Sequence, residues 1–101
     1  METSKIIQML REGIYDNKLK ELKPVSSAMV MLQAQNNQIG DIDLSKCPSL
    51  TIVAFNNNQL TSANLSACSL LQNLWLNDNQ LSTIQTPKGG MPKLEVFNLS
   101  N

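Results

Sequence analysis

The sequence predicts an α/β repeat solenoid with a parallel sheet on its concave side, a short irregular convex side and an N-terminal capping helix. Three observations lead to this prediction. One apolar pattern recurs at a spacing of 21 residues, apolar residues alternate with other residues inside each copy, and an asparagine keeps a constant place in the pattern. Similarity of this kind within one chain is the signature of repeat proteins, in which each unit packs on its neighbours.

The repeat unit is found by aligning the chain with itself. Full copies begin at Met29, Leu50 and Leu71, and each reads apolar-x-x-apolar-x-apolar-x-x-Asn-x-apolar. A fourth copy begins at Leu94, 23 residues after the third, and a degenerate copy lies upstream at residues 14–22. We therefore divide the chain into a helical cap with a degenerate first repeat (1–28) and a repeat region (29–101), in which the repeats span 29–49, 50–70, 71–93 and, in part, 94–101.

The first half of each copy is expected to be a strand. The alternation in Leu74-Trp75-Leu76 is typical of a strand with one buried face, and equivalent strands would stack in parallel. The returning segments, which carry Ile42 and Ala63, are too short for a long helix, so we expect extended or 3₁₀ backbone there. The strand residues predicted to face the core are Leu32, Ala34, Val53, Phe55, Leu74, Leu76, Phe97 and Leu99.

The pattern resembles that of the leucine-rich repeat family, over residues 14–101. Both the short repeats of bacterial surface proteins and those of cytosolic eukaryotic adaptors are similar, although Cys47 and Cys68 stand where the bacterial repeats often have asparagine. The resemblance implies a right-handed superhelix and a role in binding other proteins. It also implies that a buried asparagine in each repeat hydrogen-bonds the turning backbone, and the residues in that column are Asn17, Asn37, Asn58 and Asn79.

The two ends of the chain are predicted to differ. Thr3 or Ser4 can cap a helix over residues 3–13 that ends at Gly13, and such a helix would cover the first strand. The fourth repeat stops at Asn101 before its turn and has no such cap. Because solenoids need polar terminal caps, we expect the chain to be a fragment of a longer protein that frays, or self-associates, through its C-terminal end.

The composition argues against a catalytic or metal site and against a surface that binds nucleic acid or membranes. Formal net charge is zero and there is no histidine, so neither a nucleic-acid or membrane surface nor an imidazole site is expected. Asp41 and Asp43 are interpreted as solvated. Cys47 and Cys68 would stack with parallel Cβ vectors and are expected to be buried free thiols; a disulfide and zinc are the alternatives. We expect no enzyme, no cofactor and no metal, and a cytoplasmic location if Met1 is the native start, because no signal peptide is found.

The outward positions of the strands are the remaining candidates for function. Among them, Met31, Ile52 and Trp75 form an apolar block, and blocks of this kind usually mark a contact surface. Cross-strand packing is the alternative explanation of these residues, and a structural spacer in a longer repeat protein is the alternative function. The predicted residues for binding a protein partner are Met31, Gln33, Gln35, Ile52, Ala54, Asn56, Asn73, Trp75, Asn77, Val96 and Asn98.

Overall fold

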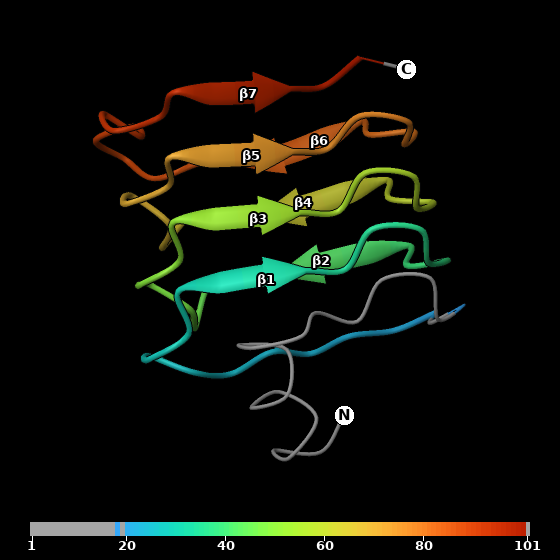
Figure 1. Ribbon diagram of the computed structural model, residues 1–101, viewed down its shortest axis with the longest axis horizontal. Coiled ribbons are helices and arrows are strands. Elements are labelled where there is room, and N and C mark those ends of the chain that lie inside the picture. Colours follow the sequence, from blue (N-terminus) through green and yellow to red (C-terminus); the bar gives the residue numbers. More distant parts are fainter. Residues whose placement is uncertain (1–17, 19, 101) are drawn as a thin grey trace.

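The computed structural model describes residues 18 and 20–100, which form a parallel-strand solenoid (Figure 1). One sheet has four strands in the order β1 (Met31–Gln33), β3 (Ile52–Ala54), β5 (Asn73–Trp75) and β7 (Val96–Asn98). The other has three strands in the order β2 (Asp41–Asp43), β4 (Ser62–Asn64) and β6 (Thr83–Gln85). The capping helix expected at residues 3–13 lies outside the described residues.

The strand register follows the sequence repeat. Leu32 pairs with Val53 and Val53 pairs with Leu74, so each turn advances by the 21-residue spacing of the pattern. Leu74 pairs with Phe97 although that step is two residues longer. The prediction of a solenoid built on a parallel sheet is therefore confirmed.

The returning segments form a second parallel sheet, so the expectation of extended backbone there is confirmed, whereas the expectation of an irregular side is wrong. Its strands pair in the same way, with Ile42 opposite Ala63 and Ala63 opposite Ile84. The backbone here is extended, which leaves its amide and carbonyl groups pointing along the solenoid, where only the next turn can pair with them. No helix occurs within residues 20–100, so the part of the chain that can be described is all-β and not α/β.

The core lies between the two sheets and runs along the whole stack. Its largest fully buried side chain is Phe55, and Leu32, Leu74 and Leu60 are equally inaccessible. The predicted burial of two residues is wrong: Phe97 is 50% exposed and Leu99 is 43% exposed. Phe97 keeps the register of Leu74, but no described turn follows β7 to cover it.

A residue with a left-handed backbone conformation turns the chain after each of the strands β1, β3 and β5. Asn36, Asn57 and Asp78 have φ angles of 60°, 58° and 59°, and each directly precedes an asparagine of the buried column. Asparagine and aspartate tolerate this conformation better than other residues with a side chain. The signal for these turns is an asparagine or aspartate at a constant place in the repeat, directly before the buried asparagine.

The connection from β6 to β7 absorbs the two extra residues of the last repeat. It contains Gly90 at φ 78°, whose amide donates to the Pro87 carbonyl at 3.0 Å, and a second turn in which the Leu94 amide donates to the Met91 carbonyl at 3.1 Å. Pro87 is buried, and Met91 packs against the core. The added length therefore forms a local double turn and leaves both sheets in register.

Candidate functional site

The outward face of the four-stranded sheet holds the residues predicted to bind a partner. The register places Met31, Ile52, Asn73 and Val96 in one row and Gln33, Ala54, Trp75 and Asn98 in the next. The core side chains between them, such as Val53 and Leu74, point the other way and are fully buried. Most of the outward side chains are partly exposed, but Ala54 is buried.

Trp75 is the most exposed member of this face. It ends β5, lies 37% exposed, and has the small side chain of Ala54 beside it on β3 and Asn98 beside it on β7. Its position is fixed from the backbone, because the Phe55 amide donates to the Trp75 carbonyl at 2.8 Å. A large amphipathic ring held on a rigid strand can contact a partner with little loss of side-chain freedom.

Amide side chains border this face where the strands end. Gln35, Asn56 and Asn77 are partly exposed, and Asn57 Nδ2 donates to Asn36 Oδ1 at 2.8 Å. Two buried oxygens, Gln35 Oε1 and Asn77 Oδ1, accept no hydrogen bond from any described residue. The border therefore consists of amide side chains, with Asp78 as its charged residue.

The buried asparagines form a ladder from turn to turn. Asn79 donates from Nδ2 to the carbonyls of Phe55 (3.0 Å) and Leu76 (3.1 Å). Its Oδ1 accepts from the amides of Asn58 (3.2 Å) and Leu60 (2.9 Å) in the preceding turn.

The same contacts recur one turn earlier. Asn58 Oδ1 accepts from the Ile39 amide at 3.1 Å, and its Nδ2 donates to the carbonyls of Ala34 (3.0 Å) and Phe55 (2.9 Å). Asn37 donates to the Ala34 carbonyl at 2.9 Å. These polar groups join successive turns, so they are not available to a partner. Asn17 lies outside the described residues.

Cys47 and Cys68 are buried free thiols stacked in adjacent turns. Cys47 Sγ donates to the Pro24 carbonyl at 3.5 Å, and Cys68 Sγ donates to the carbonyls of Leu44 and Cys47 at 3.7 Å. Burial raises the pKa of both thiols, that of Cys68 to about 11. Since the thiolate is the nucleophile, the pair is chemically inert in the folded state.

We therefore expect both thiols to be silent toward a disulfide reagent at neutral pH in the folded protein. Unfolding in denaturant without reductant should release two reactive thiols, because exposure returns both pKa values to their usual range. A titration with a chromogenic disulfide measures both counts. A count of zero in denaturant, without covalent dimers, would establish a Cys47–Cys68 bridge and contradict the prediction.

The acidic residues of β2 give no sign of a metal centre. Asp41 and Asp43 are exposed, and hydrogen bonds from Ser45 lower the pKa of Asp43, its amide donating to Oδ1 at 2.9 Å. Among residues 20–100, no cluster of three or more acidic, cysteine or histidine side chains is placed to hold a metal ion. Nor does a helix long and apolar enough to span a bilayer occur in the described part of the chain.

Comparison with known proteins adds no relative. No protein-family model matches the chain, and neither a curated protein nor a solved structure is significantly similar to it. The geometry of the described residues is therefore the basis for assigning a function.

Proposed function

We propose that this solenoid is of the leucine-rich repeat type and binds a partner protein through the outward face of the four-stranded sheet. The repeat assignment is supported by the pattern of the three full copies and by the buried asparagine ladder that joins them. The binding assignment is carried by one observation, the exposure of Trp75 on a rigid parallel sheet. Tryptophan is the residue most enriched at the energetic centres of protein interfaces.

The surroundings of Trp75 support a partner that is recognised by shape and hydrogen bonds. The rows beside it combine the apolar side chains of Met31, Ile52 and Val96 with the amides of Gln33 and Asn98. An apolar centre with a polar border is the usual anatomy of a protein interface. Because only Asp78 brings a charge to the border, the affinity should change little with ionic strength.

Replacing Trp75 with alanine should weaken partner binding by about 2 kcal/mol or more while leaving the free energy of unfolding nearly unchanged. The partner is first captured from a lysate with the wild-type protein, then purified and titrated. Trp75 is the only tryptophan of the chain, so its emission reports the contact directly. In the free protein the emission should be that of a solvent-accessible indole, and binding should shift it to the blue.

Leu70→Ala is the matched control. Leu70 is also an exposed apolar residue, at 39%, but it lies in the turn after β4 and not on the outward face. Its replacement should not alter the affinity. If the Leu70 and Trp75 variants bind the captured protein equally well, the outward face is not the binding surface, and the spacer function is the better explanation of this solenoid.

A further inference from the structure

The immediate neighbours of Trp75 on the outward face are neutral amides. Asn98 lies opposite it on β7, and Asn73 and Asn77 lie two residues before and after it, on the same side of the sheet. Ala54, its neighbour on β3, is buried. The indole ring is therefore surrounded by neutral polar groups, and the larger apolar side chains of this face lie in the other row.

These amides keep hydrogen-bonding groups for a ligand. The side chains of Asn73 and Gln33 are partly exposed and make no hydrogen bond with the described residues. Asn98 Oδ1 accepts from the Ser100 amide at 3.0 Å and from its hydroxyl at 2.8 Å, whereas Asn98 Nδ2 has no partner within residues 20–100. The outward face therefore carries unused neutral donors and acceptors beside the ring.

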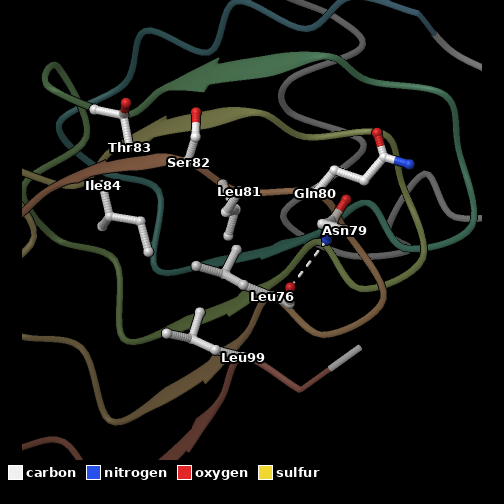
Figure 2. A pocket seen from close by; sticks show the side chains of 8 residues that line it. All are labelled: Leu76, Asn79, Gln80, Leu81, Ser82, Thr83, Ile84 and Leu99. Carbon is white, nitrogen blue, oxygen red and sulfur yellow. Dashed lines mark hydrogen bonds between the residues drawn. The ribbon is translucent and has the colours of Figure 1, made fainter.

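The ring of Trp75 lies between two side chains that point into the solenoid. Leu74 is fully buried. Figure 2 shows the side chain of Leu76 on the same side as those of Leu81 and Leu99, and Leu81 packs against the core. Alternation along the strand leaves Trp75 on the opposite side. Successive turns lie beside this face and not over it (Figure 1), so the exposure of the ring does not depend on how many turns the stack has.

An exposed indole among neutral amides has the chemistry of a saccharide site. A pyranose with equatorial hydroxyls has a face of C–H groups that packs on an aromatic ring, and each hydroxyl at its rim both donates and accepts hydrogen bonds. Charge points the same way. Between Lys46 and Lys88, a range that includes β3 and β5, Asp78 is the only charged residue. A charged ligand would lose hydration here without gaining a counter-charge.

The strand spacing favours a saccharide chain over an extended peptide. One row of the face repeats from strand to strand at about 4.8 Å, through Gln33, Ala54, Trp75 and Asn98. A β-linked pyranose chain advances by about one such spacing for each ring, so that successive rings meet successive strands. An extended peptide advances about 3.3 Å for each residue, so side chains on one side recur at about 6.6 Å and fall out of step.

We propose that the partner protein carries a neutral, β-linked saccharide chain and that this chain lies across β3, β5 and β7 with one ring stacked on Trp75. Asn98 Nδ2 and the amide of Asn73 hydrogen-bond the hydroxyls of that ring, while the small side chain of Ala54 leaves room for the next one. The inference rests on the proposed function, because it names the part of the partner that the outward face recognises.

Cellotetraose, a linear chain of four β-linked glucose units, is the probe. Maltotetraose, its α-linked isomer, is the matched control, because its curvature takes successive rings out of line with the strands. Each is titrated into the full chain while the Trp75 emission is recorded. Cellotetraose should shift the emission to the blue with a dissociation constant of about 1–10 mM, and maltotetraose should bind at least about fivefold more weakly.

Three variants test the residues, with affinities measured by titration calorimetry. Trp75→Ala should weaken cellotetraose binding at least about tenfold, and Asn73→Ala, which removes one hydrogen-bonding side chain, about threefold. Leu70→Ala should bind cellotetraose like the wild type. Protection of both thiols in the folded state verifies that each variant is folded.

Deglycosylation of the captured partner separates this inference from the proposed function. Enzymatic removal of its glycans should reduce its affinity for the wild-type protein at least about tenfold, and cellotetraose should displace the untreated partner. If the deglycosylated partner binds undiminished and Trp75→Ala still abolishes that binding, the saccharide is overturned and the protein contact stands. If Trp75→Ala leaves partner binding unchanged, the proposed function itself fails.

The direct titrations can also overturn the inference. No change in Trp75 emission up to about 10 mM cellotetraose would exclude the stacked ring. Equal affinity for the two tetrasaccharides would exclude a chain in register with the strands, and unchanged affinity of Asn73→Ala would exclude the amide contact.

Discussion

Replacing Phe55 with alanine should destabilise the protein by about 3–5 kcal/mol, as expected for deleting a fully buried aromatic ring. Phe55 is 0% exposed and follows β3, which pairs with β1 on one side and β5 on the other. The cavity would therefore lie between turns that hold each other in place. A loss of this size is a large part of the total stability of a small domain. Denaturant unfolding followed by far-ultraviolet circular dichroism measures the loss.

Phe97→Ala is the matched control, because it makes the same chemical change at a site that is 50% exposed. The ring of Phe97 has the register of a core residue but lacks a turn above it, so its removal leaves little cavity. The cost should be well below that of the Phe55 change. Equal losses at the two positions would mean that the core is closed at the C-terminal end in solution.

Asn79→Ala should destabilise the protein by about 3 kcal/mol, although it removes only a small polar group. The change leaves the amides of Asn58 and Leu60 without an acceptor and the Leu76 carbonyl without its donor. Each buried group left unpaired costs about 1–3 kcal/mol, and the three sites lie in two adjacent turns. The measurement is the same denaturant unfolding experiment.

Asn73→Ala provides the comparison for this change. Asn73 lies on the outward face of β5, is partly exposed, and makes no side-chain hydrogen bond with the described residues. Its replacement should stay within about 0.5 kcal/mol of the wild type. Similar losses for Asn73 and Asn79 would contradict the structural role of the ladder and with it the repeat assignment.

Much of the four-stranded sheet could be predicted from the sequence, because a parallel ladder and a sequence repeat impose the same spacing. Once Val53 and Leu74 occupy one column, their pairing and their burial follow together. Extended backbone was expected in the returning segments, but their pairing into a three-stranded sheet was not, because each strand contains only one inward residue, such as Ala63 in β4. A single small apolar residue gives too little alternation to predict a strand. Its pairing depends on the neighbouring turns and not on local preference.

The candidate site, too, could be predicted from the sequence only in part. The sequence places Trp75 on the outward face, because the alternation within Leu74-Trp75-Leu76 fixes the direction of each side chain. It does not predict that Leu81 and Ile84 are only partly buried, because their burial depends on whether a further turn covers them. Nor does it predict that the buried Oε1 of Gln35 has no hydrogen-bond partner among the described residues. Position on a strand can be inferred from a pattern, whereas accessibility is a property of the assembled stack.

The double turn between β6 and β7 indicates where this architecture can change length. Leu74 and Phe97 stay paired across a repeat that is two residues longer than the others, while Pro87 in the connection is buried and Met91 packs against the core. Lengthening a flexible connection costs little, about 0.6 kcal/mol for each doubling. New residues around Gly89 should therefore be tolerated without altering either sheet. A recognition sequence inserted at this point would display a foreign ligand on the solenoid and leave the outward face of the four-stranded sheet free.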